Sequence, residues 1–187
     1  MRITDNFRIS KSHWYGRLPR RVQTFIVAAG IKLGFIHRYG KIEVIVNHPD
    51  GSYTKRTGYN ILTNLGLKHM EDILVGVEAT NIEIGYIEPG SGTTTPVIGD
   101  TDTETPLTTA DRQPVASQTR STTSPFEVLI EGFISSTTYT RPQTINELAI
   151  FFTPDETGDL FARGVLSSGI VLGAGDTATL TYGFVFR

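Results

Sequence analysis

Alternating carboxylates stand in one turn-rich stretch of the sequence, where Asp100, Asp102 and Glu104 are separated by threonines. Alternate residues of a turning backbone can direct their oxygens at one hard cation, and calcium loops use this spacing. The stretch departs from a calcium loop where the turn requires glycine, because that position is Thr105, followed by Pro106. We interpret it as a solvated acidic loop, with a weak cation site as the alternative, and assign no metal or cofactor to the chain.

Neither the histidines nor the pairs of carboxylates in the sequence match a known catalytic motif. Glu127 and Glu131 lie four residues apart on an expected strand, so they share a face, as exposed or ion-paired sheet residues do. The sequence has no cysteine, G-x-S-x-G elbow, Walker A loop or H-E-x-x-H helix. We therefore expect no catalytic residue and no enzyme activity. The histidines, each without a recognisable motif, are His13, His37, His48 and His69.

The charge of the chain is divided unevenly along its length. Residues 1–58 carry 11 Lys and Arg against 3 Asp and Glu, a net of +8, and residues 59–187 carry 6 against 16, a net of −10. This asymmetry indicates a basic segment that contacts an acidic surface. Basic residues among aromatic ones would also suit nucleic acid, but we favour a protein partner. The candidate interface residues are Trp14, Tyr15, Arg17, Arg20 and Arg21.

The elements that must position these residues are mostly strands. The 26 threonines favour β structure, and the 19 glycines and 9 prolines favour turns. Pro49-Asp50-Gly51 between residues 41–48 and 52–59 predicts a β-hairpin. Short strands separated by such turns favour an antiparallel β-sandwich. Further strands are expected at 82–87, 115–122, 126–134, 145–152, 159–166 and 178–187.

One amphipathic helix is expected at about residues 60–75, where apolar residues recur at steps of three and four. Leu65 and Ile73 should face the sheet. Residues 89–114, rich in Gly, Thr, Pro and Asp, predict a long surface loop. The expected organisation is a basic arm and docking hairpin at 1–58 and a β-sandwich domain at 59–187. No apolar run has the length of about 20 residues needed to cross a bilayer.

A series of motifs over residues 60–187 resembles a widespread group of structural proteins of tailed bacteriophages. The order of the motifs carries the resemblance. The chain departs from the group at Ala149, where the group has glycine. The group also has an arginine shortly after the Gly-Asp-Thr element, and both Arg112 and Arg120 fit that position. The motifs are Asn60-Ile-Leu-Thr-Asn64-Leu-Gly66-Leu, Ile87-Glu-Pro-Gly90-Ser-Gly92-Thr, Gly99-Asp100-Thr101, Thr144-Ile-Asn-Glu147-Leu-Ala-Ile-Phe151, Leu160-Phe-Ala-Arg163 and Gly175-Asp176-Thr177 with Leu180 to Phe186.

The resemblance implies a non-enzymatic β-sandwich component of a virion, in the tail, collar, fibre-attachment or head–tail region. Its partners would be copies of itself and other virion proteins; nucleic acid is not favoured and a membrane is not expected. The basic residues 1–58 fall outside the resemblance, so we expect them to dock this chain on neighbouring subunits. The alternatives are a receptor- or carbohydrate-binding sandwich of a tail fibre and a capsid decoration protein.

Overall fold

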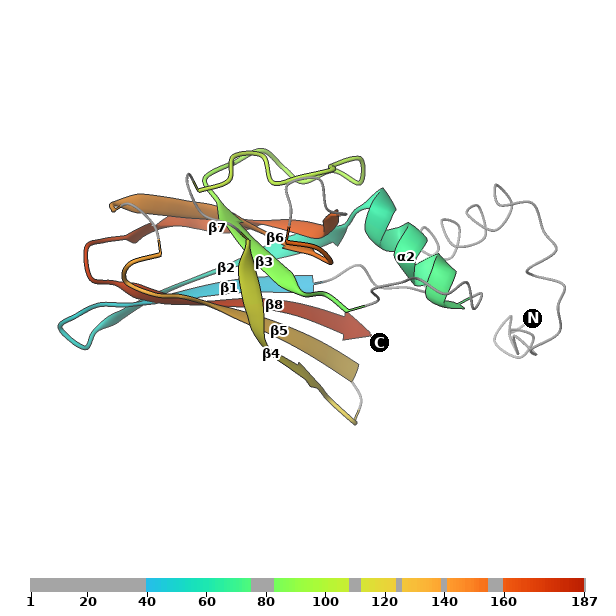
Figure 1. Ribbon diagram of the computed structural model, residues 1–187, viewed down its shortest axis with the longest axis horizontal. Helices are drawn as coiled ribbons and strands as arrows, with labels where there is room; N and C mark the ends of the chain where they lie inside the picture. Colours follow the sequence, from blue (N-terminus) through green and yellow to red (C-terminus); the bar gives the residue numbers. More distant parts are fainter. Residues whose placement is uncertain are drawn as a thin grey trace, which may run out of the picture.

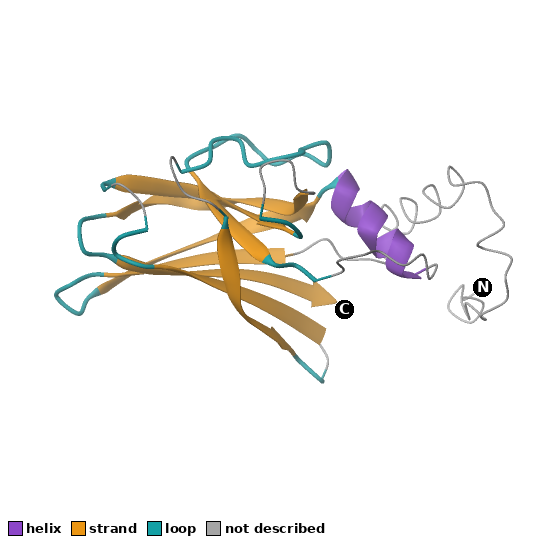
Figure 2. Cartoon of the chain, viewed as in Figure 1, coloured by secondary structure: helices purple, strands orange, loops and turns teal. Residues whose placement is uncertain are grey.

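The computed structural model describes residues 40–74, 83–107, 112–123, 126–138, 141–154 and 160–186 (Figure 1). The candidate interface residues Trp14, Tyr15, Arg17, Arg20 and Arg21 lie outside these residues, so their role stays a prediction. The described part consists mainly of strands, with one helix between β2 and β3 (Figure 2). The elements are β1 (Gly40–Asn47), β2 (Tyr53–Leu62), α2 (Asn64–Leu74), β3 (Tyr86–Gly90), β4 (Gln113–Arg120), β5 (Phe126–Ile134), β6 (Gln143–Phe151), β7 (Leu160–Leu172) and β8 (Thr177–Phe186).

The strands close into one antiparallel barrel, in the order β1-β2-β7-β6-β3-β4-β5-β8. The predicted β-sandwich is therefore wrong. Most of the predicted strands and their antiparallel pairing are confirmed, but the strand predicted at 82–87 begins only at Tyr86 and continues to Gly90. The barrel closes because the first and last strands pair over eight positions, from Gly40 with Phe184 to Asn47 with Thr177. Short alternating strands with tight turns are common to sandwiches and barrels. What separates the two folds is pairing between distant strands, which local periodicity does not encode.

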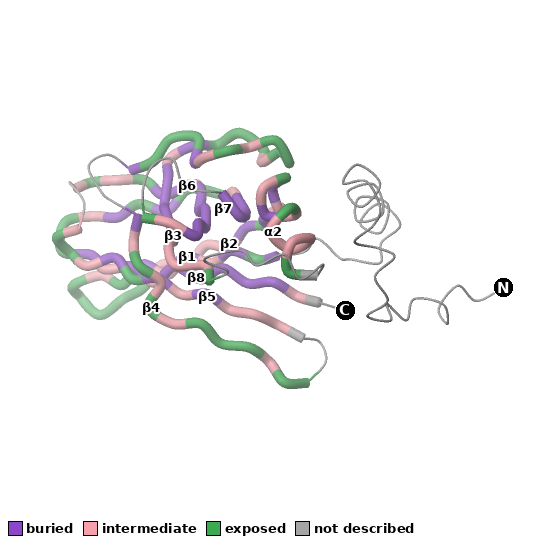
Figure 3. The backbone as a smooth tube through the Cα atoms, turned by 45° about the vertical axis from the view of Figure 1, so that its right-hand side comes forward, coloured by how far each residue is buried: buried purple, intermediate pink, exposed green. Residues whose placement is uncertain are grey.

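Alternation along the strands fills the barrel with aliphatic side chains. On β1, Ile42, Val44 and Val46 are buried while the residues between them are not. The neighbouring strand β8 contributes Leu180 and Tyr182, and the buried segments follow the strands in Figure 3. Each fully buried aliphatic side chain stabilises the fold by about 1.5–3 kcal/mol. This core holds the strands in place, and the outward side chains of the strands are positioned by it.

The predicted hairpin is confirmed, and both of its strands belong to the barrel. Gly51 has a φ of 86°, a conformation that glycine adopts without strain. Asp50 Oδ1 accepts hydrogen bonds from the backbone N–H of Ser52 at 2.8 Å and from its hydroxyl at 2.6 Å, which closes the turn. The domain boundary expected between residues 58 and 59 lies inside β2, and the docking role of the hairpin stays a prediction.

The helix begins later than predicted, because β2 continues to Leu62. Thr63 caps α2: its side-chain oxygen accepts the Gly66 N–H at 3.1 Å, which satisfies an N-terminal donor. Met70 packs against the core, but Ile73 is 48% exposed, so the prediction that Ile73 faces the sheet is wrong. The second half of α2 extends beyond the end of the barrel (Figure 1), and its apolar stripe leaves the core there. In the described part of the chain, no helix has the length and apolar character needed to cross a bilayer.

Candidate functional site

The segment between β3 and β4 crosses the outside of the barrel, and we call residues 91–107 the strap. Figure 1 shows it lying over the side formed by β6 and β7. Its two ends are joined by a hydrogen bond from Ser91 N to Thr105 O at 2.7 Å, and Leu107 N donates to Pro89 O at 3.1 Å. At its tip, Ile98 O accepts the N–H of Asn64, the first residue of α2, at 2.7 Å. The surface loop predicted at 89–114 begins and ends within β3 and β4, and its part in the strap is held at both ends and at the tip.

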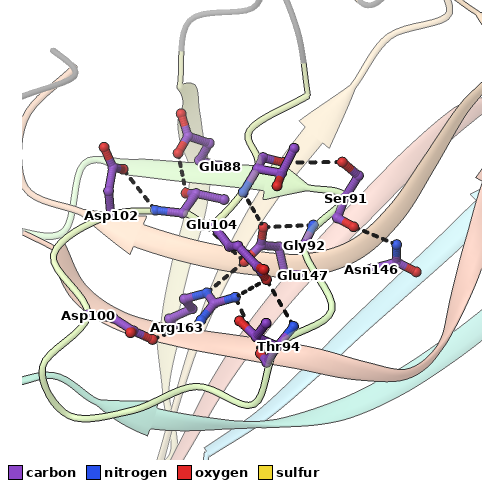
Figure 4. Close-up of polar contacts among 12 residues, drawn as sticks. Glu88, Ser91, Gly92, Thr94, Asp100, Asp102, Glu104, Asn146, Glu147 and Arg163 are labelled. Carbon is purple, nitrogen blue, oxygen red and sulfur yellow. Dashed lines mark hydrogen bonds and ion pairs between the residues drawn. The ribbon is translucent and has the colours of Figure 1, made fainter.

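A buried ion pair lies beneath the strap. Glu147 on β6 is 0% exposed, and Arg163 on the neighbouring β7 is 2% exposed. Arg163 Nε donates to Glu147 Oε2 at 2.6 Å, and the pair occupies the centre of Figure 4. A buried charge is tolerated when it is paired and its remaining hydrogen-bonding positions are filled. The strap fills those positions.

Glu147 holds the backbone of both limbs of the strap. Its Oε1 accepts the N–H groups of Gly92 and Thr105, each at 2.9 Å, and its Oε2 accepts that of Glu104 at 3.3 Å. A Cβ at Gly92 would lie 2.3 Å from Glu147 Oε1, so only glycine allows the backbone this close. One carboxylate thus anchors two segments of the strap to β6.

Arg163 holds the side chains of the strap. It donates to Asp100 Oδ2 at 2.8 Å and to Glu104 Oε2 at 3.0 Å. Burial opposes the charge of Arg163, but the hydrogen bonds to Asp100 and Glu147 outweigh it, so the pKa of Arg163 is raised. The pKa of Glu104 is lowered, first by the backbone hydrogen bond from Thr94. The Arg163 guanidinium and the Glu104 carboxylate therefore keep their charges near neutral pH.

A second arginine fixes the strap on the β3 side. Arg112 lies over the Phe151 ring, with its Cζ 3.4 Å from the ring centroid, and its side chain is 3.5 Å from Asp102 Oδ1. Arg112 Nε is 3.9 Å from Glu88 Oε1, and the Thr103 hydroxyl donates to Glu88. Burial raises the pKa of Glu88 despite these partners. Of the two arginines that fit the motif series, Arg112 is the buried one, whereas Arg120 is exposed at the end of β4.

The acidic stretch predicted as a solvated loop or weak calcium site is instead paired with arginines. Asp100 and Glu104 face Arg163, and Asp102 lies beside Arg112, so they do not converge on one point. Among the residues that the structure describes, no group of three or more side chains could hold a metal ion. The protein's own guanidinium groups occupy the place that the spacing suggested for a cation.

Of the remaining candidate residues, His48, His69 and Glu131 make structural contacts. His48 Nδ1 is 3.0 Å from Asp176 Oδ1, and its Nε2 is 3.0 Å from the Thr54 hydroxyl. The His69 ring lies against Phe152, with 4.3 Å between the ring centroids. On β5, Glu131 accepts a hydrogen bond from the Ser117 hydroxyl at 2.7 Å. Glu127, the other carboxylate that the sequence places on this face, is partly exposed on the same strand. His13 and His37 lie outside the described residues.

Sequence reasoning did not pair Glu147 with Arg163, although a signal was present. Each is the single charged residue within an apolar strand, in the segments Ile145–Phe152 and Leu160–Leu166. Charged residues at such positions are rarely buried unless they are paired. Two such residues of opposite sign therefore indicate a buried ion pair, even before the strand order is known.

The chemistry of this site is charge pairing that fixes a loop to the barrel wall. Its guanidinium groups donate to carboxylates and carbonyl groups of the same chain, and its central carboxylate accepts from backbone N–H groups. We call the set of Glu147, Arg163, Asp100, Glu104 and Gly92 the clamp. No protein-family model, curated protein or solved structure matches this chain.

Proposed function

We propose that this chain is a non-enzymatic structural component of a tailed-phage virion, located in the tail, collar, fibre-attachment or head–tail region. In this proposal it docks through its basic N-terminal part and associates with copies of itself through the barrel. Its partners are other virion proteins. The clamp holds the outer surface of the subunit in one shape, as repeated assembly of identical subunits requires.

The observation that carries this proposal is the convergence of the phage-like motifs on the clamp. Gly92, Asp100, Glu147 and Arg163 come from four separate motifs of the series and lie in contact around one buried ion pair (Figure 4). The spacing of these motifs in the sequence is thus accounted for by a single structural task. That task is to hold the strap on β6 and β7, which supports a structural role.

The composition of the strap does not support the alternative of a receptor- or carbohydrate-binding tip. Sugar-binding surfaces use exposed aromatic rings, which offer large contact area at low entropic cost. Residues 91–107 contain no Phe, Trp or Tyr. Nothing in the strap therefore favours glycan binding over a structural task.

The proposal is tested by locating the protein. An antibody raised against the purified chain should label particles of the phage that encodes it, at one fixed position in electron micrographs. Quantitative mass spectrometry of the same particles should give a constant copy number per particle. Presence in infected cells together with absence from purified particles would refute the proposal. Binding to a glycan array at micromolar concentration, with label only at fibre tips, would favour the receptor-binding alternative.

A further inference from the structure

One side of the barrel carries no covering segment from the described chain. Strands β2, β1, β8 and β5 are consecutive neighbours and form this side, which we call the open wall. The strap lies across the barrel from it, over β6 and β7 (Figure 1), and α2 packs against β7 and β2 at one end. The pairing register places outward side chains in rows; one such row joins Thr57, Glu43, Thr181 and Glu131.

Large aromatic side chains point outward from the open wall. Tyr59 is 75% exposed, Tyr53 is 69% exposed and Phe133 is 51% exposed. The solvent face of an antiparallel sheet is ordinarily polar. Exposed tyrosine and phenylalanine are enriched where proteins meet, and tyrosine is among the residues that dominate binding energy. The composition of the open wall is therefore that of a protein interface.

The charges of the open wall are of both signs, with a small excess of carboxylates. Lys41 and Lys55 both bind Glu43 at 2.8 Å, and Glu127 and Glu131 lie on the same side on β5. Two cations and three carboxylates leave a net charge of −1, whereas a nucleic-acid surface requires an excess of cations. A surface carrying both signs is complementary to a copy of itself turned by a two-fold rotation. Charge thus points to a second copy of the wall and not to a polyanion.

The size of the wall suits a modest dimer. Four strands about 4.8 Å apart and about eight residues of 3.4 Å each give a flat area of roughly 500 Å². This is at the small end of specific interfaces, which bury about 800 Å² of accessible surface on each partner. We propose that the open wall packs on the open wall of a second copy about a two-fold axis, with Tyr53, Tyr59 and Phe133 as anchors. This inference rests on the proposed function, because it names the surface through which copies associate.

The first test measures self-association of the full chain by sedimentation velocity between about 1 and 200 µM, the range expected for an interface of this size. The wild type should pass from monomer to dimer in this range. Tyr59→Ser combined with Phe133→Ser should raise the dimer Kd by about tenfold or more, because interface aromatics carry most of the binding energy. The matched control is Val97→Ser with Ile98→Ser, which removes two exposed apolar residues from the strap and should leave the Kd unchanged.

The second test uses the absence of cysteine from the sequence. Thr179 lies near the middle of the wall, opposite Ile45 and Phe133 on the flanking strands. A single Thr179→Cys substitution should form a disulfide-linked dimer under mild oxidation, and Thr95→Cys on the strap should not. Amine cross-linking of mixed isotope-labelled and unlabelled chains should join Lys41 and Lys55 between copies. Links within one chain from Lys55 to Lys11 or Lys32 would assign the wall to the N-terminal segment and overturn the inference.

The outcomes separate this inference from the proposed function. A monomer throughout the concentration range, or a dimer that tolerates loss of Tyr59 and Phe133, would overturn the open wall as an interface. Labelling of phage particles would leave the proposed function standing in either case. Conversely, a wall-dependent dimer that is absent from purified particles would support the interface and refute the virion role.

Discussion

Replacing Arg163 by methionine would remove the guanidinium of the clamp while keeping most of the length of the side chain. Glu147, 0% exposed, would then lose its counterion, and Asp100 and Glu104 would lose their shared partner. Removing one partner of a buried ion pair costs about 3–5 kcal/mol, because the remaining charge is stranded in a poorly solvated place. Whole domains are stable by only about 5–15 kcal/mol, so this is a large fraction of the total.

The assay is urea unfolding followed by circular dichroism, with a thermal melt as a second measurement. Arg163→Met should lower the free energy of unfolding by about 3–5 kcal/mol and the melting temperature by roughly 10 °C. Arg120→Met is the matched control, since Arg120 is an exposed arginine on β4, and its effect should stay within about 0.5 kcal/mol.

A double-mutant cycle shows whether the cost comes from the pair. Glu147→Gln removes the negative charge but keeps an oxygen for the strap N–H groups, so we expect a cost of about 1–3 kcal/mol. Combining Glu147→Gln with Arg163→Met leaves no stranded charge, so the double variant should lose less stability than the sum of the two single losses, by about 1 kcal/mol or more. Strict additivity, or a loss below 0.5 kcal/mol for Arg163→Met, would refute the reasoning.

Three further predictions concern the strap, the helix and the acid limit of stability. Gly92→Ala should increase the rate of limited proteolysis within the strap, because a Cβ there would lie 2.3 Å from Glu147 Oε1, and unchanged cleavage would contradict the close packing. Met70→Ala should lower the melting temperature clearly while Ile73→Ala should not, since only Met70 contacts the core. Burial opposes ionisation of Asp176, but the hydrogen bond with His48 outweighs it and lowers the Asp176 pKa from 3.8, so its stabilisation is present above pH 3.8 and is lost as the pH falls further. Asp176→Asn should therefore flatten the loss of unfolding free energy below that pH, as measured by urea unfolding at several pH values.

Local features of the fold could be predicted where a few neighbouring residues decide them. Pro49-Asp50-Gly51 fixes the first hairpin because proline restricts φ and Gly51 accepts a positive φ. The apolar spacing correctly predicts one helix but places its start too early, since Asn60 to Leu62 are equally suited to a strand and pair there with β7. A short run such as this fits both a strand and a helix, and only Thr63 as a cap marks where the helix begins.

Features that depend on distant residues could not be predicted in the same way. Barrel closure rests on the pairing of β1 with β8 and on a short join of Tyr86 and Ile87 with β4. Neither pairing affects the local alternation of apolar and polar residues, so the sequence pattern does not distinguish a sandwich from a barrel. The clamp joins Asp100 to Arg163 across 63 positions, and its acidic spacing resembled a calcium loop because the arginine partner is remote in sequence.

In the free protein the clamp holds the strap against the barrel, and amide hydrogen exchange measures this attachment directly. The N–H groups of Gly92 and Thr105 donate to Glu147, so NMR should find both strongly protected, and the Arg163→Met substitution should speed their exchange together. The N–H of Thr95, on the exposed part of the strap, serves as the unprotected reference in the same spectrum. Exchange of Gly92 and Thr105 as fast as that of Thr95 in the wild-type protein would contradict the clamp.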